Sequence, residues 1–304
     1  MLQSLVILID PYILQILVNI GIAVILALSL DVITGLTGQL SLGHAAFTGI
    51  GAFTGALLTI KAGTPFPLTI LLSGAATALT AALIGWPILR LSGDYLAICT
   101  LGFAEIVKVI FLNLEVTNKA LGLTVPSPHP ALPLPLVVLI CACLTILASA
   151  FIRISRFGRA LMAIRDDEIA AESMGIDCAR YKVQSFAVSA FIAGAGGCLY
   201  AHFIGYINPS DFGFLKSIDM LGMVVLGGLG SIPGAILGAA LLTAAPEFLR
   251  FVAQYRMLVY GALLVFLMVF RPNGLLGGID IIALVMRKLG VKPRCAPHGP
   301  EARQ

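Results

Sequence analysis

Charged residues are scarce in this sequence. Lys and Arg number 19 and Asp and Glu 15 among 304 residues, which is 11% of the chain, whereas hydrophobic residues make up 59%. A soluble domain needs roughly a quarter of its residues charged, so a soluble fold is excluded. Several apolar runs reach about 20 residues, the length that crosses a hydrocarbon core of ~30 Å. The sequence therefore predicts an all-α polytopic membrane protein.

Recognisable catalytic and nucleotide-binding motifs are lacking as well. No Gly-Lys-Ser or Gly-Lys-Thr follows a glycine-rich turn, so the lysine geometry of a phosphate loop is missing. No catalytic Ser/His/Asp set or metal-ligand cluster stands out, and the six cysteines are scattered. The net charge of +4 lies mostly in loops and tail and gives no sign of nucleic-acid binding. We expect a protein that is not an enzyme and has no metal or cofactor of its own.

Eight apolar runs are predicted to enter the membrane. They fall at about 11–34, 38–60, 66–91, 94–113, 131–152, 183–204, 217–249 and 255–270. As one helix the run 217–249 would be about 50 Å long at ~1.5 Å per residue, too long for one span. Its centre, VLGGLGSIPGAILG, is rich in glycine and contains a proline. We expect two broken segments there, and about eight to ten transmembrane or broken helices in all.

Basic residues mark two segments as cytoplasmic. A charged elbow, RFGRALMAIRDDEIAAESMGIDCARYK, forms most of the loop at about 153–182, and a basic tail covers 271–304. Lys and Arg concentrate on the cytoplasmic side of membrane proteins. Five runs precede the elbow, so the N-terminus is expected outside unless residues 2–10 add a helix. The Pro-rich loop 114–135, nearly free of Lys and Arg, should also lie outside, and the whole chain, 1–304, forms one domain.

Within the elbow, DDEIAAESMG is predicted to form a short helix at 166–175. Asp166 or Asp167 can cap its N-terminus, and Gly175 can supply a left-handed C-terminal cap. A helix of about two turns is marginal alone and gains stability by docking. The residues by themselves also fit an ordinary loop whose basic side chains only fix the orientation.

The segment GRALMAIRDDEIAAESMGID resembles the cytoplasmic coupling loop of ABC importer permeases, whose motif runs Glu-Ala-Ala, three residues, then Gly. Ala170, Ala171 and Gly175 match that motif. Ile169 stands where the Glu usually lies, and Glu168 comes one residue early. This difference leaves open which carboxylate, if any, contacts the ATPase.

Three further segments extend the resemblance over about residues 20–275. GLTGQLSLGHAAFTGIGAFTGALL, GDYLAICTLGFAEIVKVI and SIDMLGMVVLGGLGSIPGAILGA are similar to permeases of the branched-chain amino-acid importers, the LivM type in particular. The resemblance implies a permease domain for branched-chain amino acids. Urea and short-amide importers use closely similar permeases, so these substrates are the alternative.

The resemblance also implies partners and a place. These are a second related permease, two ATPase subunits that hold ATP and Mg, and a periplasmic or surface substrate-binding protein, in a bacterial inner membrane. The ATPases are expected to dock on the short helix. Residues assigned to this coupling are Arg165, Asp166, Asp167, Glu168, Ala170, Ala171 and Gly175.

A second set of residues lies in the apolar runs. Candidates for the translocation path or for helix packing are Gln39, His44, Glu105, Gly227, Gly228 and Gly230. For His44 a structural hydrogen bond is favoured, and Glu105 forms either an ion pair with Lys108, three residues along, or part of the path or subunit contact. A proton carried by Glu105 or His44 would instead indicate an ion-coupled secondary transporter. Asp31 and Asp219 are expected near segment ends, in structural roles.

Overall fold

The computed structural model describes residues 11–89, 91, 93–126, 133–248, 261, 274 and 275. Within them the chain is mostly helical, and six helices are long and apolar enough to cross a membrane. These spans are α2 (Pro11–Thr37), α3 (His44–Leu57) continued by the π-turn η1 (Leu58–Ala62), α4 (Phe66–Ile88), α5 (Asp94–Asn113), α6 (Leu134–Ile154) and α9 (Cys178–Ile204). The predicted all-α polytopic membrane fold is confirmed.

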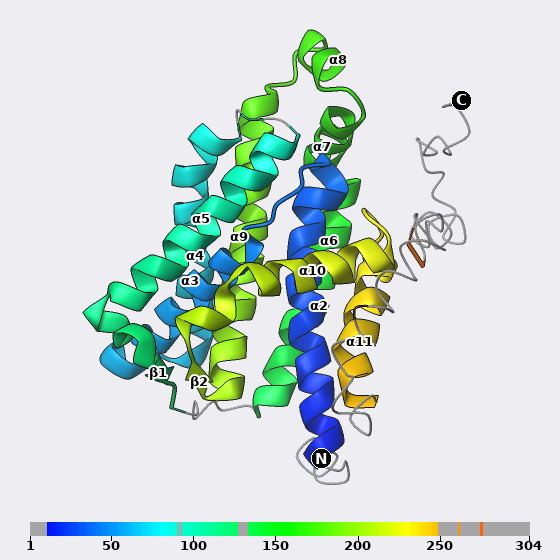
Figure 1. Ribbon diagram of the computed structural model, residues 1–304. Helices are drawn as coiled ribbons and strands as arrows, with labels where there is room; N and C mark the ends of the chain where they lie inside the picture. Colours follow the sequence, from blue (N-terminus) through cyan, green and yellow to red (C-terminus); the bar gives the residue numbers. More distant parts are fainter. Residues whose placement is uncertain are drawn as a thin grey trace.

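The two ends of this bundle carry different structures. The helices α7 (Arg156–Asp166) and α8 (Glu168–Ser173) lie at one end, called here the elbow end (Figure 1). The strands β1 (Leu123–Thr124) and β2 (Tyr206–Ile207) pair antiparallel at the opposite end. Short 3₁₀ helices flank them: η2 (Glu115–Thr117), η3 (Lys119–Leu121) and η4 (Pro209–Phe212).

The direction of α2 follows from this arrangement. It begins at the end opposite the elbow, and five spans of the described chain precede the elbow. The start of α2 and the described part of the Pro-rich loop therefore lie at the end of the bundle opposite the basic elbow, and the prediction that they face outward stays a prediction. Residues 2–10 lie outside the described residues, as does the tail 271–304 apart from Gly274 and Leu275.

The second predicted run, 38–60, is not helical throughout. Its first six residues form an irregular segment after the end of α2, and α3 starts only at His44 (Figure 1). The backbone N–H of Leu42 donates a hydrogen bond to Thr100 Oγ1 at 3.1 Å, and a Cβ on Gly43 would meet the Thr100 carbonyl oxygen at 2.1 Å. Irregular backbone survives at membrane depth when protein buries it or when it lines a cavity. Both conditions hold here, as the site below shows.

The predicted break in the run 217–249 is present. Helix α10 (Phe214–Gly227) runs across the middle of the bundle, and α11 (Ile232–Phe248) returns toward the end opposite the elbow (Figure 1). At ~1.5 Å per residue neither spans a hydrocarbon core of ~30 Å. Gly228 and Gly230 turn the chain with φ of 111° and 76°. The run 255–270 lies outside the described residues apart from Gly261.

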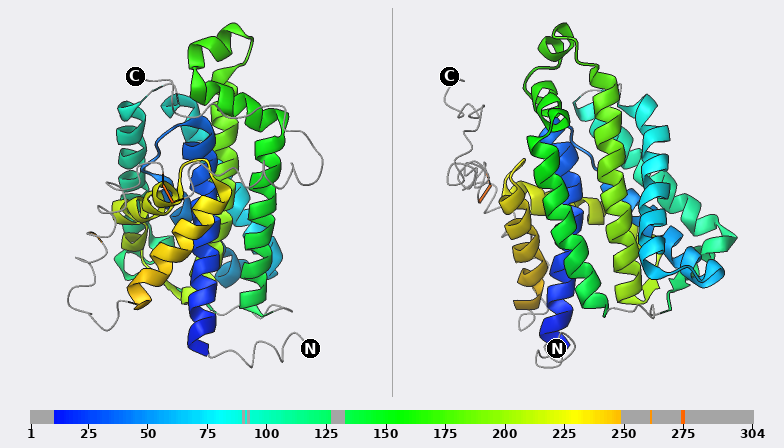
Figure 2. Two further views of the ribbon diagram at one scale, coloured as in Figure 1. Left: turned by 90° about the vertical axis from the view of Figure 1, so that its right-hand side faces the viewer. Right: turned by 180° about the vertical axis from the view of Figure 1, so that it is seen from behind.

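Helix α9 packs most extensively against α4, α3 and α2, and stands between the α2–α6 pair and the α4–α5 pair (Figure 2, right). Glycine lets its backbone approach α3 closely. A Cβ on Gly51 would lie 2.2 Å from the Gly194 carbonyl oxygen, and one on Gly197 would lie 2.0 Å from that of Thr48. These glycines pack helices together, as small residues do in membranes.

Candidate functional site

The elbow begins with α7, a helix that the sequence analysis did not predict. The Oγ of Ser155 caps it by accepting a hydrogen bond from the backbone N–H of Gly158 at 3.1 Å. Leu161 and Ile164 are buried, one helical turn apart. Apolar residues at this spacing among charged ones are the sequence signal that would have revealed α7.

The predicted short helix is present as α8, and both of its ends match the prediction. Asp167 Oδ1 accepts hydrogen bonds from the backbone N–H groups of Ile169 at 2.9 Å and Ala170 at 3.0 Å. Asp167 is therefore the N-terminal cap, whereas Asp166 ends α7. Gly175 has a φ of 84°, the left-handed conformation that ends a helix.

An ion pair ties α8 to the bundle. The Glu168 carboxylate lies 2.6 Å from the Lys182 ammonium, and the Lys182 side chain is only 7% exposed. Ala171 is buried, which sets that face of α8 against the protein. Ile169 and Met174 are 78% and 83% exposed. Ile169, which stands where the coupling-loop motif of ABC importer permeases has Glu, therefore presents an apolar side chain outward.

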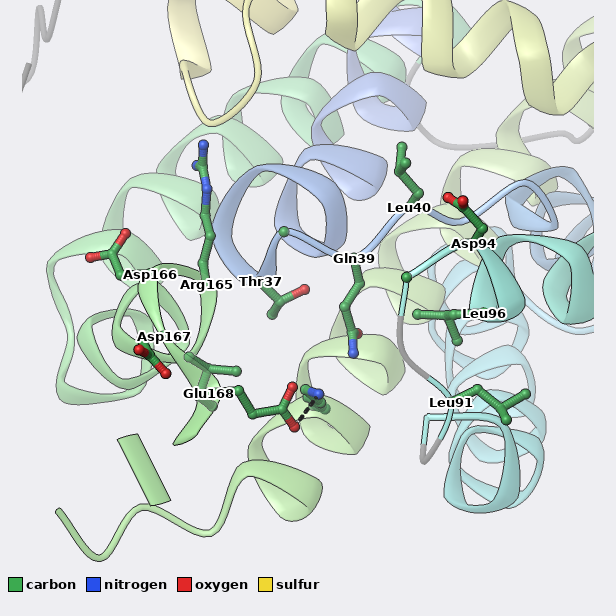
Figure 3. Close-up of a pocket in the computed structure, with 14 residues that line it drawn as sticks. Thr37, Gln39, Leu40, Leu91, Asp94, Leu96, Arg165, Asp166, Asp167 and Glu168 are labelled. Carbon is green, nitrogen blue, oxygen red and sulfur yellow. Dashed lines mark hydrogen bonds and ion pairs between the residues drawn. The ribbon is translucent and has the colours of Figure 1, made fainter. Parts of the chain in front are cut away.

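Beneath the elbow lies a cavity of about 310 Å³, called here the elbow cavity. The end of α7, the start of α8, the irregular segment after α2 and the approach to α5 line it (Figure 3). Its charged lining residues are Asp94, Arg165, Asp166, Asp167, Glu168 and Lys182. Two clusters that the sequence analysis kept separate, the elbow residues and Gln39, thus share one cavity.

Gln39 is a buried amide on this cavity. It is 8% exposed, and its Oε1 has no hydrogen-bond partner among the described residues. Its side chain points into the space that Glu168 also faces (Figure 3). An unsatisfied buried acceptor costs free energy, so this amide is poised to accept a hydrogen bond from a group entering the cavity.

Arg165 points away from the cavity, toward the α10–α11 turn (Figure 3). Its Nη1 donates a hydrogen bond to the carbonyl oxygen of Gly35 in α2. A Cβ on Gly230 would lie 3.0 Å from that same Nη1. Arg165, two residues before the Asp167 cap of α8, therefore reaches the break between α10 and α11.

Two further side chains hold the α10–α11 turn. Asp31 Oδ1 accepts a hydrogen bond from the backbone N–H of Gly230 at 2.8 Å, and Arg153 donates one to the carbonyl oxygen of Gly230. The name Gly230 junction is used here for the five residues in these contacts: Asp31, Gly35, Arg153, Arg165 and Gly230. It joins α2, α6, α7 and the break between α10 and α11.

Asp31 corrects one expectation. From the sequence it is expected near a segment end, where solvation costs little free energy, but it is 5% exposed inside α2. A carboxylate inside an apolar run costs free energy unless it has a polar partner. The sequence therefore contained a sign that Asp31 is paired. The partner, Gly230, lies 199 positions away, so the pairing was not predictable from spacing.

The remaining candidate residues lie outside the elbow cavity. His44 is fully buried, and its Nε2 lies 2.7 Å from Ser29 Oγ, which confirms the favoured hydrogen bond. Glu105 and Lys108 form an ion pair at 3.1 Å. Gly227 packs on α11, where its Cβ would meet the Gly234 carbonyl oxygen at 2.1 Å.

One group of described residues brings possible metal ligands together. Donor atoms of Glu168, Glu172 and Cys178 lie within 4.8 Å of one another. The Glu168 carboxylate is bound to Lys182, and the Cys178 thiol donates to the Glu168 carbonyl oxygen at 3.7 Å. Two surface carboxylates with one thiol match no preferred ligand set for a common metal.

Comparisons with known proteins agree on one family. The family described as "Branched-chain amino acid transport system / permease component" matches residues 12–268. The chain is 38% identical to the high-affinity branched-chain amino acid transport system permease protein LivM of Salmonella typhimurium, over 84% of this chain and 68% of that protein. It is 29% identical to the corresponding permease protein BraD of Pseudomonas aeruginosa, over 84% and 92%.

A second type of permease protein is also similar. LivH of Salmonella typhimurium is 36% identical over 45% of this chain and 46% of its own length. No solved structure matches the chain.

Proposed function

The chain belongs to the family of branched-chain amino acid transport system permease components, and on this premise we propose that it is a transmembrane permease subunit of an ABC importer for branched-chain amino acids. The observation that best supports this is α8, a capped helix at the elbow end with Ile169 and Met174 exposed. A helix this short gains stability by docking, and exposed apolar side chains suit a protein partner. We place the chain in the bacterial cytoplasmic (inner) membrane, with the basic elbow inside the cell.

The rest of the assembly is proposed from the same relatives. LivM and LivH of Salmonella typhimurium both carry the name of a high-affinity branched-chain amino acid transport system, and this chain resembles both. We propose a second, related permease as partner, together with two ATPase subunits and a periplasmic or surface substrate-binding protein. ATP and Mg²⁺ would bind in the ATPase subunits, since the chain has no Gly-Lys-Ser/Thr phosphate loop.

In the proposed cycle the elbow is a lever. Closure of the ATPases on ATP displaces α8 and α7, and Arg165 transmits the displacement to α2 and to the α10–α11 break through the Gly230 junction. Access then changes from the inner to the outer side. The free energy is the difference between the ATPase contacts in the two states, since a ligand shifts an equilibrium only by its differential affinity.

The described bundle suits an apolar cargo. Few charged side chains lie inside it, and Glu105, the carboxylate that a proton-coupled transporter would use, is paired with Lys108. Broken helices with free backbone groups form the substrate paths of several transporter folds. We therefore propose leucine, isoleucine and valine as substrates, with urea and short amides as competitors in the uptake assay.

The test is a pull-down of the tagged protein from its native membrane in mild detergent, followed by mass spectrometry. We expect ATPase subunits and a second permease to be recovered with it. Scrambling residues 166–175 should remove the ATPases while the permease pair remains. A protein recovered alone in several mild detergents, with leucine uptake that survives ATP depletion but needs a pH gradient, would overturn the proposal in favour of a secondary transporter.

A further inference from the structure

A second cavity lies within the membrane part of the bundle, far along the chain from the elbow. It measures about 90 Å³ and is lined by residues of α2, α9, α10 and α11. The polar side chains on its lining are Asn19, Tyr200, Lys216, Asp219 and Thr243. Since ~10–15 Å³ holds one water-sized group, the cavity has room for several, comparable to a small organic molecule.

The cavity carries both signs of charge at membrane depth. Lys216 and Asp219 lie three residues apart on α10, the half-length helix that crosses the middle of the bundle (Figure 1). The Lys216 ammonium lies 5.3 Å from the centroid of the Tyr200 ring, a cation–π distance. Ionisable groups in this position are costly, which makes them site candidates by default.

The rest of the wall is apolar and adaptable. Ile22 and Leu26 of α2 and Met220 and Met223 of α10 also line the cavity. Methionine side chains are flexible and fill irregular space, so two of them can adjust to apolar groups of different branching. The lining of the cavity thus combines apolar, pliable side chains with a cation and a carboxylate.

A polar group on this lining is also unsatisfied. Thr243 Oγ1 is buried and has no hydrogen-bond partner among the described residues. Asn19, half-buried on α2, adds an amide with both a donor and an acceptor. A molecule with hydrogen-bonding ends and an apolar body would satisfy these groups and fill the apolar wall together.

We propose that this cavity binds one free amino acid with a branched apolar side chain, and this inference rests on the proposed function. The Lys216 ammonium binds the carboxylate of the amino acid, the Asp219 carboxylate binds its ammonium, and the side chain lies among Ile22, Leu26 and Met223. The same α10 ends in the glycines at the Gly230 junction. One half-helix therefore carries the binding groups at its start and meets the elbow at its end.

The direct test is photolabelling in native membranes that contain the complete transporter. The probe is a diazirine analogue of leucine, used after confirming that it competes with leucine for uptake. We expect peptides of α2 around residues 19–26 and of α10 around residues 216–223 to be labelled, and excess leucine to remove the label. Label confined to other segments, or no label at all while uptake is intact, would overturn the cavity as the binding site.

A variant pair gives an independent readout. Lys216→Gln should raise the KM for leucine uptake at least about tenfold, the effect of losing one charge-assisted hydrogen bond. The matched control is Lys61→Gln, because Lys61 is exposed on η1 and does not line the cavity. An unchanged KM in a Lys216→Gln protein that inserts normally contradicts the proposal. If the unmodified transporter takes up no leucine, the proposed function fails instead, and the two failures are thereby distinguished.

Discussion

The guanidinium of Arg165 donates a hydrogen bond to the carbonyl oxygen of Gly35 across 130 positions of sequence. Its aliphatic stem passes 3.0 Å from the place where a Cβ on Gly38 would lie. A glycine is needed there, both for this approach and for its φ of 71°. The last turn of α7 is thus fixed to the last turns of α2, where the chain leaves the helix to line the elbow cavity.

This relationship gives the elbow a mechanical connection to the membrane segments. Arg165→Gln should lower leucine uptake at least about tenfold, since a hydrogen bond from a charged donor contributes about 1.5–3 kcal/mol. ATPase subunits should remain bound, because α8 itself is untouched. Uptake and ATP hydrolysis measured together in proteoliposomes would show hydrolysis uncoupled from transport.

Arg159 provides the matched control. It lies on the same helix, is exposed, and donates to the Ile154 carbonyl oxygen at 2.8 Å, entirely within the elbow region. Arg159→Gln should transport at the unmodified rate. Equal uptake by the Arg165 and Arg159 variants would show that the Gly230 junction transmits nothing.

Gly230 should be hard to replace, because its backbone is left-handed and its neighbours are close. Gly230→Ala puts a Cβ 3.0 Å from Arg165 Nη1 and 3.1 Å from the Gly35 carbonyl oxygen, at a φ of 76°. The left-handed conformation alone costs about 1–2 kcal/mol for a residue with a Cβ. Thermal unfolding in detergent should show a lower midpoint for this variant.

Gly102 is the contrasting position for that experiment. It lies inside α5, and a Cβ there would meet no atom of the described residues within 4 Å. Gly102→Ala should leave the unfolding midpoint unchanged or raise it slightly, because alanine is the better helix former. If the two variants unfold alike, the turn at Gly230 is not under the constraint that its geometry indicates.

The sequence predicted the helices better than the site. Uninterrupted apolar runs located the spans, and the Gly- and Pro-rich centre of 217–249 located the break, because each signal is local. The irregular segment before His44 was missed, since its apolar residues and glycines look the same in a helix as in a cavity wall. Contacts of Leu42 and Gly43 with Thr100, on α5, fix its path.

The candidate site was predictable in part for the same reason. The cap at Asp167 and the end at Gly175 follow from local chemistry, and both are present. Arg165 was assigned to the elbow, but its inward direction depends on Gly35 and Gly230, distant in sequence. Contacts of that kind are fixed by tertiary packing, which a single sequence does not reveal.

The ion pair between Glu168 and Lys182 should be needed to hold α8 in place. Glu168→Gln leaves a 7% exposed lysine without its carboxylate, a loss of about 1–3 kcal/mol. Hydrogen exchange of the α8 amides should become faster. The double variant Glu168→Gln with Lys182→Met should recover part of the loss, since the uncompensated charge is gone. If the α8 amides exchange as fast in the double variant as in the single variant, α8 is held by other contacts.

Gly175 tests whether α8 couples transport. Its φ of 84° disfavours any β-branched residue. A Cβ there would meet no atom of the described residues within 4 Å, so a substitution should act through the backbone conformation and not through a steric clash. Gly175→Val should abolish uptake and leave membrane insertion intact, because the end of α8 must change direction. Gly175→Asn, which tolerates the left-handed conformation, should retain most of the uptake. Normal uptake by Gly175→Val at normal membrane levels would show that the coupling helix lies elsewhere.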